Sequence, residues 1–322
     1  SAATVVLAAV KLAEYGDVIA VRTRLGGMFV GTLLLAGATS LPELLTNINA
    51  LRQGVPDLAV GSVFGSSMFN MFLLGVLDLI HWRKRILRLV AMKHALTASL
   101  ANMLMAAAVF FILADISLQI GWVGVDSLAL ILIYIAGVRL IQRNSGGPSA
   151  PEPDEAEIDP QMPSLLRAGI GFAAASGALV LVTPCLVRSS VAIAEITGLS
   201  TGFVGALLVA MVTSLPEMVT VIAATRIGAY DLAVGNLFGS NAFNMLVLGL
   251  TDFFYLPGRF LGSIDSSFAL VGLLGLLLTT LGLVGNLARL ERRIFFLELD
   301  AAMLILGYVG GMALLYSRGI GL

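Results

Sequence analysis

Two glutamates in matching apolar surroundings are the residues of this sequence best suited to chemistry. Glu43 ends the run Thr-Ser-Leu-Pro-Glu, and Glu217 ends a second copy of that run in the other half of the chain. An ionised carboxylate inside an apolar span is costly, so such a residue indicates a function by default. Two carboxylates brought together in a low dielectric repel, and at least one takes up a proton unless a cation lies between them. A divalent ion such as Ca2+ prefers oxygens from carboxylates, amides, carbonyls and hydroxyls, and it would cancel both charges.

Each glutamate is preceded by a proline, which predicts a break in the helix that carries it. Pro42 and Pro216 have no backbone N–H, and a proline ring clashes with the carbonyl four residues back. The break is expected to free or loosen backbone carbonyls one turn earlier, on Ala36, Ala38, Ala210 and Val212. Carbonyls at membrane depth must be satisfied, and a bound cation satisfies them. Hydroxyls beside the break belong to Thr39, Ser40, Thr213 and Ser214.

A glycine-rich motif follows each glutamate. It reads Gly-x-x-x-Gly-Ser-x-x-x-Asn, from Gly61 to Asn70 and again from Gly235 to Asn244. Glycines four residues apart form a smooth helix face for close approach, although this pattern alone is equally typical of ordinary packing. The serine and the asparagine of each copy are also four apart, so they point the same way. Close packing would therefore bring four polar side chains toward the glutamates, those of Ser66, Asn70, Ser240 and Asn244.

The duplication runs through all these blocks, because every block follows its first copy at the same offset that separates Glu43 from Glu217. Packing alone would not require a glutamate and an asparagine at matching depths in both halves. Apolar runs near the ~20 residues needed to cross a bilayer recur along the chain. They predict ten spans, at about 3–20, 26–50, 57–80, 95–114, 119–141, 166–194, 201–225, 231–254, 265–287 and 298–316. The first is weak, because Lys11, Glu14 and Asp17 interrupt it.

These spans predict an all-α membrane protein with ten transmembrane helices arranged as two inverted five-helix repeats. Because five is odd, the second copy enters the membrane from the opposite side, and such repeats place a binding site at the midplane. We expect a first repeat at 1–141 with its motif at 36–75, a cytoplasmic linker at 142–165, and a second repeat at 166–322 with its motif at 210–249. Of the 19 Lys and Arg residues, fourteen then lie on the linker side. This bias places both termini outside.

The composition excludes a soluble protein. Hydrophobic residues make up 58% of the chain and charged residues 12%, against about a quarter charged in soluble domains. We therefore expect an integral multi-pass protein of a plasma or bacterial inner membrane, surrounded by lipid. The sequence carries no Walker motif, which argues against ATP-driven transport. It shows no nucleophile–base pair or metal triad, which argues against an intramembrane enzyme, and it predicts no cofactor and no nucleic-acid partner.

The paired motifs resemble the two alpha repeats of the cation/Ca2+ exchanger (CaCA) superfamily, most closely those of its sodium/calcium exchanger branch. The two signatures occur twice in the same order, over about 39–75 and 213–249. The resemblance implies antiport of Ca2+ against Na+ by alternating access, with the first and sixth helices sliding against the rest. The transported ions are then the partners, and no cofactor is implied.

The resemblance also implies a ligand set by position. The central Ca2+ ligands correspond to Glu43, Asn70, Glu217 and Asn244. The carbonyls of Ala36 and Ala210 and the hydroxyls of Thr39 and Thr213 fall at further ligand positions. Positions that line Na+ sites in the family are occupied by Ser40, Ser66, Ser214 and Ser240.

Three departures from the family pattern bear on the choice of ion. Ala38 and Val212 stand where the family has glycine, and their side chains would narrow the pathway or shift the carbonyls. Serines replace two asparagines of the first glycine-rich motif, while the second motif keeps them (Ser62 and Ser67 against Asn236 and Asn241). Both deepest amide positions are asparagine, whereas K+-dependent relatives carry an aspartate there, which argues against K+ co-transport.

Na+/Ca2+ exchange is the leading interpretation. The alternatives are an H+-coupled exchanger, an exchanger for another divalent cation such as Mg2+ or Mn2+, and, in a different class, a cation channel that uses the carboxylate pair as a filter. Oligomeric state and transport direction are left open.

Overall fold

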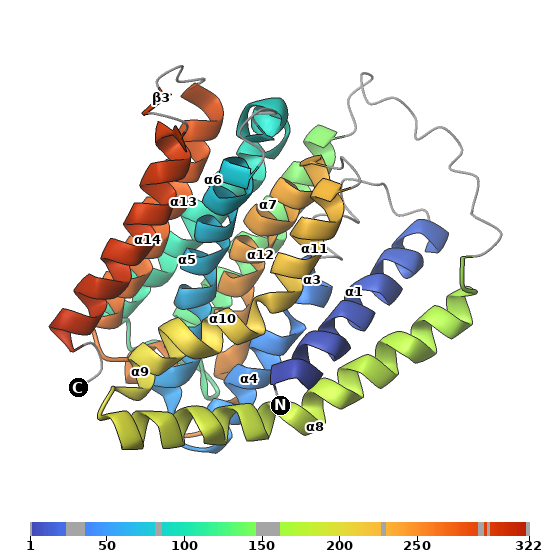
Figure 1. Cartoon of the computed structure of the whole chain (residues 1–322). Helices are drawn as coiled ribbons and strands as arrows, with labels where there is room; N and C mark the ends of the chain where they lie inside the picture. The colour runs from blue at the N-terminus through green and yellow to red at the C-terminus, as the bar shows by residue number, and fades with distance from the viewer. Residues whose placement is uncertain are drawn as a thin grey trace.

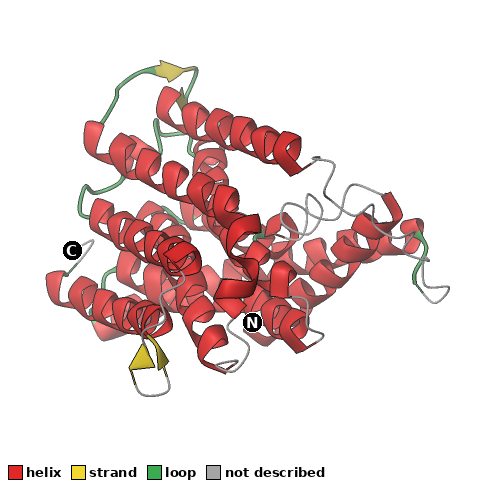
Figure 2. Ribbon diagram, turned by 90° about the horizontal axis from the view of Figure 1, so that it is seen from above, coloured by secondary structure: helices red, strands yellow, loops and turns green. Residues whose placement is uncertain are grey.

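The computed structural model describes residues 2–23, 36–80, 86–145, 162–226, 230–288, 293–294 and 297–319. Across these residues the chain is a bundle of helices with two short antiparallel hairpins, seen from the side in Figure 1 and from above in Figure 2. The first half contains α1 (Ala2–Thr23), α3 (Ala36–Thr39), α4 (Leu41–Arg52), α5 (Pro56–Ile80), α6 (Ile86–Ala114), β1 (Gln119–Ile120), β2 (Val123–Gly124) and α7 (Val125–Ser145). The second half contains α8 (Leu165–Thr197), α9 (Thr201–Val204), the π-helical turn η2 (Gly205–Val209), α10 (Ala210–Thr213), α11 (Leu215–Arg226), α12 (Tyr230–Thr251), the 3-10 turns η3 (Asp252–Phe254) and η4 (Leu261–Ser263), α13 (Phe268–Ala288), β3 (Arg293–Ile294), β4 (Leu297–Glu298) and α14 (Leu299–Arg318).

Several elements of the two halves match at one constant offset. Helices α3 and α4 correspond to α10 and α11, whose bounds are shifted by the same offset that separates Glu43 from Glu217. The hairpin β1–β2 corresponds to β3–β4 with this shift. Helices α7 and α14 begin at matching positions as well, Val125 and Leu299. The duplication predicted from the sequence motifs therefore extends to segments whose sequences do not obviously match.

Eight helices of the described residues are long and apolar enough to cross a membrane: Pro56–Ile80, His94–Ala114, Val125–Arg143, Leu165–Thr197, Thr201–Arg226, Ala233–Phe254, Phe268–Gly285 and Leu299–Arg318. They agree with eight predicted spans. Of the other two, 3–20 is covered by α1, and 26–50 begins in residues 24–35, outside the described part of the chain. Most of the predicted linker also lies outside it.

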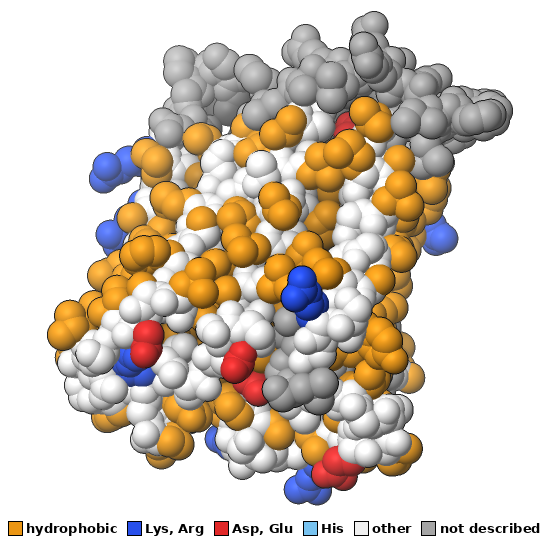
Figure 3. Space-filling view, turned by 90° about the vertical axis from the view of Figure 1, so that its left-hand side faces the viewer, with side chains coloured by type: hydrophobic (Ala, Val, Ile, Leu, Met, Phe, Trp, Pro, Cys, Tyr) orange, Lys and Arg blue, Asp and Glu red, His pale blue; other side chains and the backbone are white. Residues whose placement is uncertain are grey.

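The surface agrees with a lipid environment. Figure 3 shows hydrophobic side chains across the middle of one face, with most of the acidic side chains in its lower half. Large apolar residues on the outer helices are exposed, for example Leu181 and Ile196 on α8 and Leu306 on α14. In water such exposure would be costly, whereas in a bilayer it is expected. In Figure 1 the N- and C-termini both lie at the lower end of the bundle.

Helices α5 and α12 form the centre of the bundle and are buried along most of their length. They pack against each other, α5 also packs against α13 and α14, and α12 packs against α6, while α1 and α8 pack together at one side. The glycines of α5 explain how closely its neighbours approach. A Cβ atom added at Gly61 would collide with the backbone carbonyl of Gly202, and one at Gly65 with that of Ala206. The close packing predicted from the Gly-x-x-x-Gly motif is therefore confirmed on α5.

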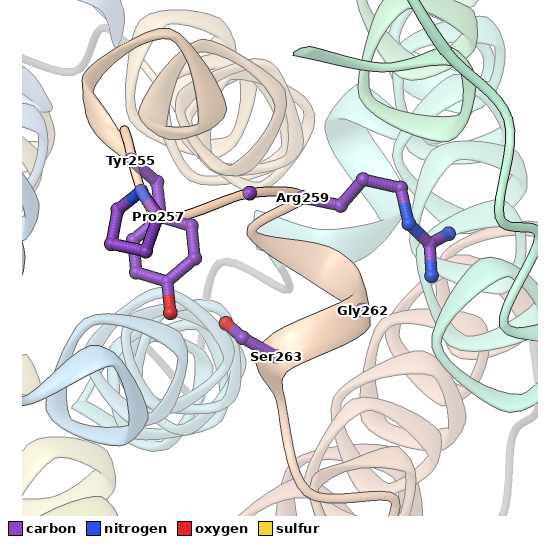
Figure 4. A pocket seen from close by; sticks show the side chains of 6 residues that line it. Tyr255, Pro257, Arg259, Gly262 and Ser263 are labelled. Atoms are coloured by element: carbon purple, nitrogen blue, oxygen red, sulfur yellow. The ribbon is translucent and has the colours of Figure 1, made fainter. Parts of the chain in front are cut away.

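A buried arginine holds the loops together at one end of the bundle. Arg259 donates hydrogen bonds to the carbonyl of Ile116 and the carboxylate of Asp115, and its Nη1 lies 3.3 Å from Oδ2 of the buried Asp126. In Figure 4 the guanidinium extends away from Tyr255 and Pro257, which line a pocket of about 200 Å³ beside this loop. The guanidinium of Arg259 thus forms ion pairs with two aspartates, Asp115 and Asp126, that do not line the pocket.

We expect Arg259→Ala to lower the free energy of unfolding by about 3–5 kcal/mol, because it leaves Asp126 buried without its cationic partner. The measurement is denaturant or thermal unfolding of the purified protein in detergent. Asp115→Asn is the matched control, since the Asp115 side chain is 71% exposed and an exposed ion pair contributes less than about 1 kcal/mol. Equal losses in the two variants would contradict the structural role assigned to Arg259.

Candidate cation site

The two glutamates lie just after interruptions in their helices. Helix α3 ends at Thr39 and α4 begins at Leu41, with Ser40 between them at φ −89° and ψ 8°. Ser214 separates α10 from α11 in nearly the same conformation, at φ −86° and ψ 7°. Pro42 then falls in the first turn of α4, where a helix needs no N–H from it. The break predicted from the prolines is confirmed in both halves.

This geometry places each carboxylate in the first turn of a 12-residue helix, Glu43 in α4 and Glu217 in α11. The first turn carries unpaired N–H groups and the positive end of the helix dipole, which favours negative charge. Both residues are buried, with 1% of their surface exposed. The local fold therefore holds two acidic groups where solvent cannot screen them.

Serines from both halves hold one oxygen of each carboxylate. Oε1 of Glu43 accepts hydrogen bonds from Ser66 at 3.4 Å and from Ser214 at 3.3 Å. Oε1 of Glu217 accepts from Ser240 at 3.4 Å and from Ser40 at 3.1 Å. Each glutamate thus takes one serine from its own half and one from the other. The four serines predicted to line the site are brought to it.

The cross-contacts between the two halves are reciprocal. Ser40 of the first half contacts Glu217, and its counterpart Ser214 contacts Glu43, the counterpart of Glu217. The matched segments are therefore related by approximate two-fold symmetry at the site.

Four buried oxygens at the site have no hydrogen-bond partner among the described residues. They are Oε2 of Glu43, Oε2 of Glu217, Oδ1 of Asn70 and Oδ1 of Asn244. A buried oxygen without a partner costs free energy, and one such oxygen comes from each of the four residues predicted as central ligands. Two carboxylate and two amide oxygens form a hard-oxygen donor set of the kind that Ca2+ prefers.

The threonines and the alanine carbonyls are more fully engaged. Thr39 donates to the carbonyl of Ala36 at 3.2 Å, and Thr213 donates to the carbonyl of Ala210 at 3.3 Å. The same two carbonyls accept the backbone N–H of Ser40 at 2.9 Å and of Ser214 at 3.0 Å. The expected loosening of these two carbonyls is therefore wrong. A proline removes only its own N–H, and the donor to Ala36 is Ser40, which precedes Pro42 in the chain.

Two further residues of the site were not among the predicted ligands. Asn70 Nδ2 donates to Oδ1 of Asn241 at 3.0 Å, and Asn244 Nδ2 donates to Oγ of Ser67 at 3.3 Å. Ser67 and Asn241 are counterparts in the two halves and are buried. In the sequence each lies three residues before a ligand asparagine, which places both on one helix face, and this spacing could have identified them.

Known proteins share this arrangement of helices and motifs. The family model described as sodium/calcium exchanger protein matches residues 1–141 and 168–316. The chain belongs to this family. The family is one of membrane exchangers, and the CaCA resemblance drawn from the motifs is confirmed.

Two curated relatives and two solved structures resemble this exchanger. It is 28% identical over 302 residues to a putative antiporter CaxA of Alkalimonas amylolytica, covering 90% of this chain and 88% of CaxA. It is 42% identical over 79 residues to the sodium/calcium exchanger MaX1 of Methanosarcina acetivorans, covering 24% of this chain and 23% of MaX1. The structure of native YfkE aligns with a TM-score of 0.67 at 18% identity, covering 98% of this chain and 90% of YfkE. A structure of the sodium-calcium exchanger NCX_Mj aligns with a TM-score of 0.57 at 19% identity, covering 96% and 94%. At these identities the two structures establish the fold of the exchanger.

All twelve predicted site residues lie in the described part of the exchanger, and none has more than 1% of its surface exposed. Elsewhere in the described residues, no group of three or more His, Cys, Asp and Glu side chains could hold a metal ion. The glutamate pair, with its serine and asparagine neighbours, is thus the candidate cation site of the described residues.

Proposed function

We propose that this exchanger is a secondary active antiporter that exchanges Ca2+ for Na+ by alternating access. The observation that supports it most is the set of four buried oxygens without partners, one each from Glu43, Glu217, Asn70 and Asn244. Two buried carboxylates repel each other, and a divalent cation between them neutralises both. The family to which the chain belongs favours Na+ as the counter-ion, as does its similarity to the sodium/calcium exchanger MaX1.

We propose ten transmembrane helices in two inverted five-helix repeats, at 1–141 and 166–322, joined by a cytoplasmic linker at 142–165. The matched element bounds and the reciprocal cross-contacts at the glutamates support two repeats related by approximate two-fold symmetry, and the odd number of spans in each repeat supports their inversion. Eight helices have the length and composition of spans, and α1 with the segment ending in α4 would supply the other two. The cytoplasmic linker puts both termini outside, in a plasma or bacterial inner membrane.

In this proposal each glutamate divides its two oxygens between protein and substrate. Oε1 stays with its two serines, and Oε2 faces the cation together with the amide oxygens. The hydroxyls of Ser40, Ser66, Ser214 and Ser240 hydrogen-bond to the same carboxylates and serve the Na+ ions that replace Ca2+. The hydroxyls of Thr39 and Thr213 are further ligands of Ca2+. The carbonyls of Ala36 and Ala210 join the ligand set when the hydroxyls of Thr39 and Thr213 turn away from them. Because both ions need the same two negative charges, binding of one excludes the other.

The test is uptake of radioactive Ca2+ into proteoliposomes that contain the purified protein. With Na+ inside and none outside, we expect Ca2+ uptake at least about tenfold above that with Na+ at equal concentration on both sides, since a tenfold ion gradient supplies ~1.4 kcal/mol per ion. Collapsing the Na+ gradient with an ionophore should abolish the difference.

The other outcomes identify the alternatives. Uptake that is independent of Na+ and depends on an imposed pH gradient would establish an H+-coupled exchanger. If excess Mg2+ or Mn2+ suppresses Ca2+ uptake and is itself transported, the substrate is that ion rather than Ca2+. Resolvable unitary currents without a counter-ion requirement would establish a cation channel.

A further inference from the structure

The two amide ligands are tied across the halves by matched hydrogen bonds. Asn70 on α5 donates its Nδ2 to Oδ1 of Asn241 on α12 at 3.0 Å. Asn244 on α12 donates its Nδ2 to Oγ of Ser67 on α5 at 3.3 Å. Ser67 and Asn241 lie at corresponding positions of the two repeats. Each half thus supplies one acceptor that receives the amide of the other half's ligand.

Such an acceptor matters because the oxygen and the NH2 group of an asparagine amide have nearly the same size and shape. Its carbonyl oxygen binds a cation, whereas its NH2 group carries two donors and repels one. Rotation by half a turn exchanges them at almost no steric cost. An acceptor placed against Nδ2 fixes the choice, and in both ligands the Oδ1 atom is then the one left without a partner.

Further hydrogen bonds orient Ser67 and Asn241 so that each presents an acceptor atom to its asparagine. Ser67 donates its hydroxyl proton to the carbonyl of Val63 at 3.1 Å, so its lone pairs are left to receive Asn244. Asn241 uses its NH2 group on the carbonyl of Ser67 and on Oγ1 of Thr279, both at 3.2 Å, so its Oδ1 is left to receive Asn70. Thr279 in turn donates to the carbonyl of Gly275 at 2.8 Å.

We propose that Ser67 and Asn241 are positioning residues that set which atom of Asn244 and Asn70 faces the transported cation. This inference rests on the proposed cation-exchange function. The two sides differ in strength: Asn241 is an amide fixed by two donated hydrogen bonds of its own, whereas Ser67 is a hydroxyl that makes one. The Ser67–Asn244 side is therefore the more sensitive to substitution.

The first measurement is Ca2+ affinity, as the Ca2+ concentration that half-saturates the thermal stabilisation of the purified protein in detergent. We expect Ser67→Ala to raise this concentration about tenfold, the order expected for one buried hydrogen bond. Ser67→Cys, with a weak sulfur acceptor of similar size, should fall between Ala and wild type. Ser190→Ala is the matched control, because Ser190 is a buried helical serine whose hydroxyl also bonds a carbonyl four residues back. It should leave Ca2+ affinity unchanged.

The second measurement repeats Ser67→Ala in an Asn244→Asp background. The two oxygens of a carboxylate are equivalent, so no rotation can turn a donor toward the cation. We expect Ser67→Ala to change Ca2+ affinity less than about threefold there, against about tenfold with Asn244 present. An equal loss in both backgrounds would assign Ser67 a packing role and overturn the proposal.

The outcomes separate the two levels of inference. If wild-type protein binds Ca2+ and Ser67→Ala binds it equally well, the positioning role is wrong while the proposed exchange function stands. If wild-type protein shows no Ca2+-dependent stabilisation and no Ca2+ flux, the proposed function is wrong and the positioning role falls with it.

Discussion

Replacing Glu43 with glutamine is expected to abolish Ca2+ exchange, with transport at least about a hundredfold below wild type, equivalent to ~2.7 kcal/mol. The substitution removes one of the two negative charges at the site. It also reverses the chemistry of the atom that faces the substrate. Ser66 and Ser214 both donate hydrogen bonds to Oε1, so the amide oxygen of glutamine stays with them. The NH2 group then takes the place of Oε2 and repels a cation.

Glu217→Gln should behave in the same way, because Ser40 and Ser240 hold its Oε1. Neither change should unfold the protein, since loss of one carboxylate removes the repulsion between the two glutamates when no cation is bound. Stabilisation by Ca2+, however, should disappear along with binding. Glu195→Gln on α8 is the control, because this glutamate is exposed. Near-normal Ca2+ flux in either site variant would overturn the assignment of the site.

The parts of the site that the sequence predicts are those with a local cause. Pro42 and Pro216 cannot donate an N–H to the preceding turn, so each favours an interruption before α4 or α11. An ionisable residue in an apolar span has few alternatives to function. The repeated spacing then gives the correspondence of Glu43 with Glu217 and of Asn70 with Asn244. These features depend on neighbours within one helical turn, which the sequence shows directly.

Contacts between the halves could not be predicted, because they depend on how α5 and α12 are aligned with each other. The bonds from Asn70 to Asn241 and from Asn244 to Ser67 exist only in the observed register. The sequence marked positions 67 and 241 as departures from symmetry without indicating what they touch. The contacts of Arg259 with Ile116 and Asp126 join loops far apart in the chain. They could not be predicted from the sequence for the same reason.

Helix ends were predicted less well than helix centres. Apolar periodicity predicted a span from about residue 95, whereas α6 begins at Ile86. Hydropathy marks the part of a helix that crosses lipid, and the backbone hydrogen bonds continue beyond it. The π-helical turn η2 also has no signature in the residues Gly205–Val209. It lies where the backbone of Ala206 meets Gly65, so it reflects tertiary packing.

The second large effect is expected from the smallest possible substitution at that contact, Gly65→Ala. The added Cβ atom would overlap the backbone of Ala206. A Cβ atom built with ideal geometry on Gly65 lies 2.6 Å from the Cα of Ala206. Backbone cannot rotate away as a side chain can, so α5 must move away from η2. Ser66 is the next residue, and its hydrogen bond to Glu43 at 3.4 Å and its contact with Thr213 at 3.5 Å are already long. Both would be lost.

We therefore expect Gly65→Ala to reduce Na+-dependent Ca2+ uptake at least about tenfold, the equivalent of ~1.4 kcal/mol. Gly310→Ala on α14 is the control, because a Cβ atom there meets nothing within 4 Å. Since alanine favours helix over glycine by up to about 1 kcal/mol, this control should transport normally and unfold no more easily than wild type. Wild-type uptake in both variants would mean that the approach of α5 to η2 does not position Ser66. A loss confined to Gly65→Ala would tie the glycine motif to the carboxylate pair through one backbone contact.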